Sequence, residues 1–137
     1  MQSVYTEITL ENSADVTNAC DGLIQEHEVH RMRVNAIADT SVWNLVINEA
    51  TRAQLGLRIN RTCEVEVAKG VTEKGGITEP VSVRWRNRYT ACDALVLPNE
   101  RDVLLGNLPL FGMDLMVDPH SKEVVGAHGD KPRYVVK

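Results

Sequence analysis

Aromatic residues are scarce in this sequence: Phe, Trp and Tyr together make up 4% of its 137 residues. Proteins that bind single-stranded nucleic acid stack successive bases on several aromatic side chains, so that function is not expected. Basic residues are also in the minority, because 15 Lys and Arg stand against 19 Asp and Glu. A protein that neutralises many phosphates is basic, and we therefore expect no nucleic-acid partner. With so few aromatic rings, the hydrophobic core must be aliphatic.

Long apolar runs are missing as well. No stretch approaches the roughly 20 apolar residues of a transmembrane helix, so no membrane partner is expected. The N-terminal segment lacks the basic start and the apolar run of a secretory signal. Cys20, Cys63 and Cys92 are few and far apart, which favours reduced thiols over disulfides; Cys63 and Cys92 are able to meet across neighbouring strands. These absences predict a cytoplasmic protein.

Alternation of apolar and polar residues with a period of two dominates the sequence and predicts β-strands. The expected strands cover residues 4–10, 32–38, 65–67, 81–85 and 89–97. The Gly-rich polar segment 69–80 has the composition of a mobile hairpin tip. Short strands separated by turn signals are typical of a closed or sandwich-like all-β domain, and the length predicts one domain over residues 1–137.

Helical signals are limited to short segments. Asn48 is placed to cap a helix over 49–55, with glycine as its C-terminal stop. Asn107 is placed in the same way to cap a brief helical turn over 108–113. Residues 11–30 break the strand pattern and predict an excursion between the first two strands that contains about one helical turn.

The most informative segment begins where the second expected strand ends. Asp39 follows this apolar strand directly, Thr40 and Ser41 supply two hydroxyl groups, and apolar residues resume at Val42. A carboxylate flanked by apolar sequence is expected to be partly buried, and burial penalises its charged form unless hydrogen bonds compensate. Two interpretations stay open: a general acid or base, or a strand-end aspartate that caps a turn.

Several further motifs accompany Asp39 along the chain. Among them, Val103-Leu104-Leu105-Gly106 predicts a buried strand whose end approaches another backbone closely. In chain order the motifs are Ala38-Asp39-Thr40-Ser41, Leu45-Val46-Ile47-Asn48-Glu49, Leu55-Gly56-Leu57, Ala68-Lys69-Gly70, Cys92-Asp93-Ala94-Leu95-Val96-Leu97-Pro98, Leu104-Leu105-Gly106, Met113-Asp114-Leu115-Met116-Val117-Asp118-Pro119 and Val125-Gly126-Ala127-His128-Gly129-Asp130. In this order and spacing, the sequence resembles the retropepsin-like aspartic proteases (clan AA), and in particular their small bacterial members.

The resemblance implies an all-β, retropepsin-like closed barrel of short strands with one or two short helices. It also implies an aspartic endopeptidase without cofactor or metal ion, in which Asp39 is the catalytic acid and base and Thr40 and Ser41 shape the catalytic loop. Aspartic proteolysis needs two carboxylates, whereas this chain carries a single Asp-Thr-Ser. The active site is therefore expected to lie between the two subunits of a homodimer, each contributing one Asp39.

The same resemblance implies a substrate-binding region around the catalytic loop. Ala68, Lys69 and Gly70 would belong to a flap that closes over an extended peptide or protein substrate. Leu105 and Gly106 would form the floor beneath the catalytic loop.

Ser41 departs from the family pattern, in which glycine follows Asp-Thr. If the backbone needs a positive φ at this position, a non-glycine residue costs roughly 1–2 kcal/mol. If it does not, the Ser41 hydroxyl is able to donate to Asp39 and favour the ionised form, which disturbs a shared proton. The alternatives are therefore a catalytically weak or inactive dimeric peptide-binding module, and a monomeric β domain in which Asp39 is structural.

Other candidate residues point to less specific functions. His27 and His30 flank Glu28, but the spacing is one residue short of the zincin motif, so no metal site is predicted. Asp114 is expected to act as a turn or hydrogen-bonding residue. Arg86-Asn87-Arg88 is expected to form a polar turn before the strand that begins at residue 89. Alternation along this hairpin predicts one solvent-exposed face that carries Arg84, Arg86 and Arg88, and binding of an acidic peptide there stays open as an alternative.

Overall fold

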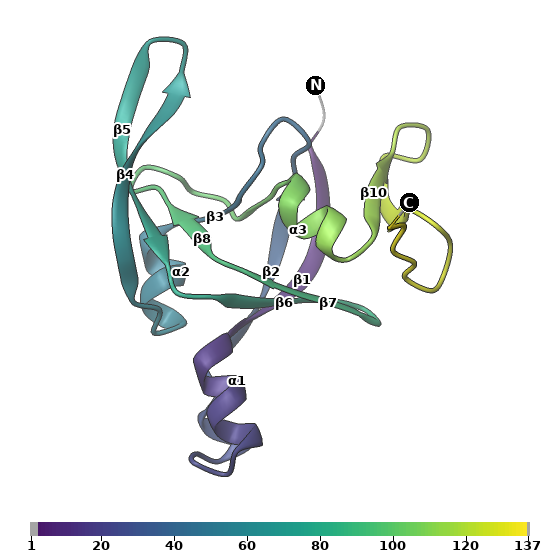
Figure 1. The fold of residues 1–137 in the computed structure, drawn as a ribbon. Helices are drawn as coiled ribbons and strands as arrows, with labels where there is room; N and C mark the ends of the chain where they lie inside the picture. Colours follow the sequence, from purple (N-terminus) through teal and green to yellow (C-terminus); the bar gives the residue numbers. More distant parts are fainter. Residues whose placement is uncertain (1–2, 137) are drawn as a thin grey trace.

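A curved β-sheet dominates the computed structural model, which describes residues 3–136 (Figure 1). The strands are β1 (Val4–Asn12), β2 (Arg31–Ala38), β3 (Leu45–Ile47), β4 (Ile59–Ala68), β5 (Val71–Thr78), β6 (Val81–Trp85), β7 (Arg88–Cys92), β8 (Ala94–Val96), β9 (Leu104–Leu105), β10 (Leu115–Asp118) and β11 (Glu123–Gly126). The helices are α1 (Ser13–Cys20), the 3₁₀ helix η1 (Glu26–Glu28), α2 (Glu49–Gln54) and α3 (Asn107–Gly112). None of the helices within these residues is long and apolar enough to cross a membrane.

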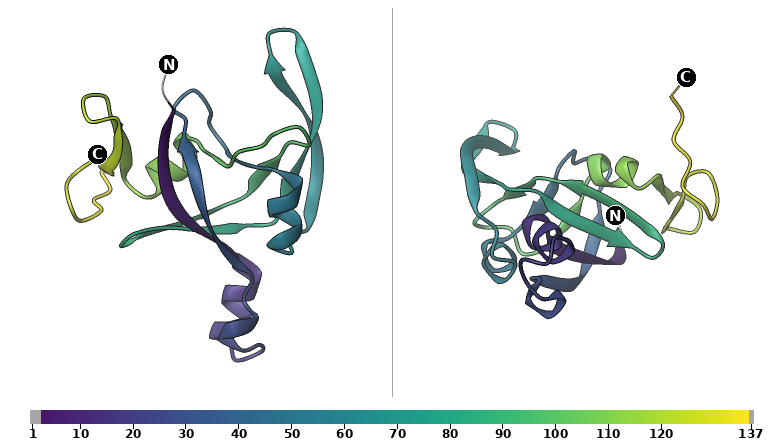
Figure 2. Two further views of the ribbon diagram at one scale, coloured as in Figure 1. Left: turned by 180° about the vertical axis from the view of Figure 1, so that it is seen from behind. Right: turned by 60° about the horizontal axis from the view of Figure 1, so that its bottom comes forward.

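The strand order confirms the all-β prediction. Nine strands form one sheet in the order β4-β5-β8-β3-β9-β2-β1-β6-β7, and β10 and β11 form a separate two-stranded sheet. The large sheet bends around a central core, with β1 and β2 crossing β6 and β7 at an angle (Figure 2). The end strands β4 and β7 share no ladder within residues 3–136, so closure of the barrel stays a prediction.

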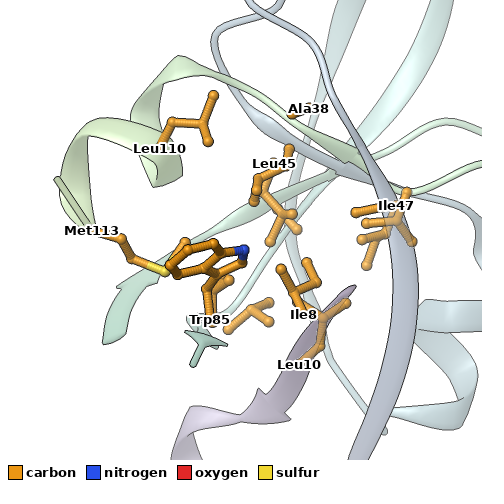
Figure 3. Close-up of a cluster of buried hydrophobic side chains, with 14 of the residues drawn as sticks. Ile8, Leu10, Ala38, Leu45, Ile47, Trp85, Leu110 and Met113 are labelled. Carbon is orange, nitrogen blue, oxygen red and sulfur yellow. The ribbon is translucent and has the colours of Figure 1, made fainter. Parts of the chain in front are cut away.

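Aliphatic side chains fill most of the core, as the scarcity of aromatic residues predicted (Figure 3). Ile8 from β1, Leu45 from β3 and Met113 after α3 meet in this cluster. Each fully buried aliphatic side chain contributes about 1.5–3 kcal/mol of hydrophobic stabilisation. Trp85 is the aromatic exception, and its indole Nε1 donates a hydrogen bond to Thr6 Oγ1 (2.8 Å), so its polar atom is satisfied inside the core.

The excursion between β1 and β2 is more helical than predicted. Asn12 ends β1 and caps α1, because its side-chain oxygen accepts a hydrogen bond from the backbone N–H of Asp15 (3.2 Å). Two turns of helix follow where about one was expected, and α1 buries none of its residues. Because α1 has no buried face, the sequence shows no helical periodicity there, and the cap is the main local signal.

The other two helices begin close to the predicted positions. Asn48 caps α2 as predicted, since its Oδ1 accepts a hydrogen bond from the backbone N–H of Thr51 (2.8 Å). The prediction for Asn107 as a cap was wrong: α3 already includes Asn107, and its N-terminal cap is Gly106. The Asn107 side chain instead contacts the loop that follows β2.

The predicted hairpin tip over 69–80 is mostly strand. The turn consists of Lys69 and Gly70, and β5 takes up most of the remainder. Glycine in β5 reflects close packing, because a Cβ on Gly75 would lie 2.9 Å from a methyl group of Val65. The hairpin of β4 and β5 extends beyond the rest of the sheet (Figure 1).

The strand predicted over 89–97 is divided into two. β7 pairs with β6, whereas β8 pairs with β3 and β5, and Asp93 lies at the break between them. Cys63 and Cys92 therefore do not meet across neighbouring strands, since β4 and β7 are the two ends of the sheet order. Alternation by itself does not reveal where a strand changes partners.

The predicted exposed face of three arginines is wrong for Arg88, which is buried. The hairpin turn holds two residues, Arg86 and Asn87, so Arg88 lies opposite the buried Trp85. Arg84 stays on the outer face. The prediction assumed a three-residue turn that included Arg88, and a one-residue difference in turn length moves a side chain to the other face of the sheet.

The Arg88 guanidinium joins the hairpin to the C-terminal part of the chain. Nη1 donates hydrogen bonds to the carbonyl oxygens of Met113 (3.1 Å) and Asp114 (2.8 Å), and Nη2 donates to that of Gly129. The Asp114 carboxylate also lies 3.6 Å from Nη1. These contacts explain why a charged side chain is tolerated in the interior.

Asp114 is the second centre of this network, in agreement with its predicted hydrogen-bonding role. Its Oδ1 lies 2.7 Å from His128 Nδ1, and its Oδ2 accepts a hydrogen bond from the backbone N–H of Arg133 (2.9 Å). The pKa of the Asp114 carboxyl is lowered by the Arg133 N–H and further by His128 and Arg88, against the opposing effect of burial. Asp114 thus ties the segment after β11 to the junction of α3 and β10.

We expect Arg88→Leu to destabilise the fold by at least about 2 kcal/mol, because buried carbonyl oxygens lose a charged donor. Denaturant unfolding of the variant and the wild type measures this difference. Arg86→Leu is the matched control in the same hairpin: the exposed Arg86 guanidinium lies over the Trp85 ring, 4.4 Å from the ring centroid, and should contribute less than about 1 kcal/mol. Equal losses for the two variants would contradict the assigned role of Arg88.

Candidate active site

Asp39 lies at the carboxyl end of β2, where a loop over residues 39–44 leads to β3. β9 is inserted between these two strands: Leu105 lies opposite Ala38 in a parallel ladder and opposite Leu45 in an antiparallel one. The backbone N–H of Asp39 donates a hydrogen bond to the carbonyl oxygen of Leu105 (3.0 Å). The loop therefore spans the full width of β9, about 10 Å between the axes of β2 and β3.

Residues at the start of α3 fix this loop through hydrogen bonds. The backbone N–H of Gly106 donates to Asn44 (3.1 Å), and that of Asn107 donates to Val42 (2.9 Å), each through the carbonyl oxygen. The Asn107 side-chain amide donates to the carbonyl oxygen of Thr40 (2.9 Å). The loop over residues 39–44 is thus fixed by contacts with α3 on both sides of Ser41.

Gly106 makes the close backbone approach that its sequence context predicted. A Cβ at this position would overlap the carbonyl oxygen of Asn44 and would lie 2.7 Å from the backbone of Trp43. These are backbone atoms held by the sheet, so they are unable to move aside as a flexible side chain would. Glycine is needed here because of space, and Leu105 beside it is fully buried beneath the loop.

Ser41 contacts the Asp39 carboxylate directly. Its backbone N–H donates to Asp39 Oδ1 at 2.9 Å, and its hydroxyl donates to the same oxygen at 2.6 Å. Ser41 does not have the positive φ found at three other non-glycine residues of the described chain. Serine in place of glycine therefore does not strain the backbone at this position. Its effect is on the Asp39 carboxylate, because the Ser41 hydroxyl occupies one side of Oδ1.

A pocket of about 450 Å³ opens beside Asp39 on the side of β1 and β10. Thr40, Val117 and Lys122 are among the residues that line it, together with Val4 at the start of β1. Lys122 was not selected from the sequence as a site residue. Its position in the turn between β10 and β11 gives no local signal, because only the tertiary fold brings this turn to the end of β2.

The flap residues named from the sequence lie at the tip of the β4–β5 hairpin. Ala68, Lys69 and Gly70 are exposed there, and Gly70 has a φ of 76°, which fits a tight turn. Nearer the base of the hairpin, Cys63 and Val65 pack in one apolar cluster with Val42 of the Asp39 loop. The hairpin base and the Asp39 loop therefore share a side-chain cluster.

Two other groups considered from the sequence have simpler roles. His30 pairs with Asp15 through Nδ1 and Oδ2 (2.7 Å), and residues 3–136 contain no cluster of three possible metal ligands. The three cysteines are unpaired. Burial, with a contribution from Asp93, raises the pKa of Cys92 to about 11, so this thiol stays protonated and unreactive at neutral pH.

These features define an all-β domain with a retropepsin-like fold. The retroviral protease-like domain of Ddi1 from Leishmania major is similar in structure, with a TM-score of 0.58 and 16% identity over 98% of this chain and 96% of that one. EIAV protease in complex with the inhibitor HBY-793 is also similar, with a TM-score of 0.53 and 17% identity over 80% of this chain and 86% of that one. No family model and no curated protein matches the sequence. At such low identity the likeness concerns the fold.

Gly106→Ala should destabilise the protein by about 1–3 kcal/mol, the usual cost of forcing an extra methyl group into a packed site. Denaturant unfolding measures the loss. Ala91→Ser, an exposed position in β7, is the control and should change stability by less than about 0.5 kcal/mol. If Gly106→Ala is as stable as the wild type, the loop is not held against β9 as described.

Proposed function

We propose that this protein is an aspartic endopeptidase whose active site is built from Asp39 of two copies of the chain. The observation that carries the proposal is the position of Asp39: a single Asp-Thr-Ser loop, fixed by β9 and α3, in a retropepsin-like fold. Because the chain has one such loop, the second carboxylate must come from a second copy. A peptide or protein substrate is the partner this site requires.

The proposed chemistry depends on two carboxylates that share one proton. Like charges at short distance do not both ionise, so one Asp39 stays protonated while the other accepts a proton from the attacking water. The protonated carboxyl donates to the oxygen of the scissile carbonyl, and the pair titrates as a unit. Asp39 is half-buried, and its backbone is held by Leu105, which supports a fixed position for the dyad.

The hairpin tip at Ala68, Lys69 and Gly70 has the proposed role of a flap. An extended peptide would be gripped by backbone hydrogen bonds as an added strand between the flap and the floor at Leu105 and Gly106. Cross-dimer hydrogen bonding by the Thr40 side chain belongs to the same proposal. A cytoplasmic location, a homodimer, and the absence of nucleic-acid and membrane partners belong to it as well.

A second candidate is a dimeric peptide-binding module without strong catalysis. The hydrogen bond from the Ser41 hydroxyl to Asp39 Oδ1 favours it (2.6 Å). This donor occupies a hydrogen-bonding position on Oδ1, whereas the dyad requires that one carboxyl hold a proton between the two aspartates. The two candidates share the dimer and the peptide-binding region between flap and floor, and they differ in whether peptide bonds are cleaved.

Asp39→Asn separates the two candidates. If the proposal is correct, the wild type cleaves a diverse peptide mixture between about pH 3.5 and pH 7, and the variant loses cleavage because an amide is unable to exchange the proton. Mass spectrometry of the products measures both. Asp102→Asn, an exposed loop position, is the matched control and should keep full activity. A wild-type dimer that cleaves nothing, or cleavage that survives Asp39→Asn, would refute the endopeptidase.

Ser41→Gly should raise the peptidase activity by about tenfold, the kinetic value of one hydrogen bond that opposes the protonated carboxyl. Ser41→Ala distinguishes the hydroxyl from the Cβ: it removes the donor and keeps the side-chain carbon. We expect most of the gain already in Ser41→Ala. Cleavage rates of both variants at matched dimer concentration test this, and unchanged rates would show that Ser41 does not limit catalysis.

A further inference from the structure

A second pocket lies where the end of α3, the start of β10 and the C-terminal segment meet. Its volume is about 350 Å³, and it shares no lining residue with the pocket beside Asp39. Exposed apolar side chains form much of its wall, among them Phe111, Met116 and Val135. Cavities of this size that combine an apolar wall with a few polar groups are typical of sites for small ligands.

His128 and Asp114 contribute polar groups to this pocket. The Asp114 side chain is 7% exposed, and its lowered pKa keeps the carboxylate charged, so its oxygens only accept hydrogen bonds. At the contact of 2.7 Å with Asp114 Oδ1, the His128 Nδ1 therefore carries the hydrogen. This bond fixes the imidazole ring and leaves Nε2, on the opposite side of a side chain that is 35% exposed, for a ligand.

The charges around this pocket favour an anion. Arg88 balances the charge of Asp114, since its Nη1 lies 3.6 Å from the Asp114 carboxylate. Arg133 also lines the pocket, and its guanidinium takes part in none of the ion pairs among residues 3–136. The positive charge of Arg133 is therefore left over within this part of the chain. A guanidinium recognises a carboxylate through two parallel hydrogen bonds.

The walls of the pocket are fixed before a ligand binds. The Phe111 ring forms an edge-to-face pair with Trp43, with centroids 6.2 Å apart and an interplanar angle of 72°. The Tyr134 hydroxyl donates to the last carbonyl oxygen of α3 (2.8 Å), and the backbone N–H of Arg133 donates to Asp114 Oδ2 (2.9 Å). A preformed site loses little conformational entropy when it binds its ligand.

We propose that this pocket binds a carboxylate attached to an apolar or aromatic group. The carboxylate accepts hydrogen bonds from the Arg133 guanidinium and from Nε2 of a protonated His128, whose Nδ1–H remains on Asp114. The apolar group of the ligand packs against the apolar wall of the pocket. The site does not involve Asp39, so this inference goes beyond the proposed peptidase and does not depend on it.

Titration of the full chain with phenylacetate, followed by the NMR signals of the histidine rings, tests the inference. The His128 signals should shift until they saturate, whereas those of His27, His30 and His120 should stay in place, because these three do not line the pocket. Phenylacetamide is the matched ligand, since it has nearly the same size and no charge. It should bind at least tenfold more weakly, as expected when a charged hydrogen bond is lost.

Variants of two neighbouring cations test the role of Arg133. Arg133→Gln should raise the Kd for phenylacetate at least tenfold, and it keeps the backbone N–H that Asp114 accepts. Lys131→Gln is the matched control: it removes the same charge from an exposed residue that does not line the pocket, and it should change the Kd less than about twofold. Asp39→Asn should bind phenylacetate like the wild type, which separates this site from the proposed active site.

A second ligand distinguishes the two sources of such a carboxylate. Phenylacetate represents a free organic acid, and an N-acetylated tripeptide that ends in phenylalanine represents the C-terminus of a peptide. Tighter binding of the tripeptide than of phenylacetate would assign the pocket to a peptide C-terminus, and weaker binding would assign it to an organic acid.

Three results would overturn the inference: no saturable shift at His128, equal affinities for phenylacetate and phenylacetamide, or equal losses in Arg133→Gln and Lys131→Gln. The second result would show an apolar cavity without recognition of the carboxylate. A protein that binds phenylacetate at His128 and cleaves no peptide would support this site and refute the endopeptidase.

Discussion

The insertion of β9 between β2 and β3 is the constraint on which the candidate site depends. Leu105 pairs with both neighbouring strands, and the chain then turns at Gly106 directly under the loop that carries Asp39. A Cβ at position 106 would overlap the backbone of Trp43 and Asn44. Only glycine therefore allows the chain to pass this close beneath the loop. The position of Asp39 is therefore set by backbone geometry, which side-chain motion does not alter.

A polar network fixes the position of the C-terminal third of the chain, as β9 fixes the position of the Asp39 loop. Arg88 and Asp114 are buried side chains whose partners are mostly backbone groups, and they join the β6–β7 hairpin to the segment after β11. Buried charges are costly unless they are paired and hydrogen-bonded, so this arrangement fixes one conformation of the segment. That conformation places Tyr134 beside the end of α3, where its hydroxyl donates a hydrogen bond to the carbonyl oxygen of Gly112.

Ser41 introduces a conflict between structure and chemistry at the candidate site. Its two hydrogen bonds to Asp39 Oδ1 hold the carboxylate in a defined orientation, which a catalytic group needs. In the proposed dyad, the Ser41 hydroxyl also occupies a hydrogen-bonding position on Oδ1, where the shared proton would lie. The backbone at Ser41 carries no left-handed strain, so the fold accepts serine in place of glycine, and the consequence is limited to proton transfer and to the space above the loop.

The sequence by itself determined the strands β1, β2 and β6, the aliphatic core, the cap at Asn48 and the Asp39 loop, because alternation, capping and turn chemistry are local properties. It also predicted the close approach at Gly106. Tertiary structure alone decided the features that depend on distant pairing: the burial of Arg88, the split of β7 from β8, the use of Asn107 to hold Thr40, and the meeting of Trp43 with Phe111. Most of these features join residues that are well separated in the chain. The burial of Arg88 depends on the length of the hairpin turn, because a change of one residue in that length moves a side chain to the other face of the sheet.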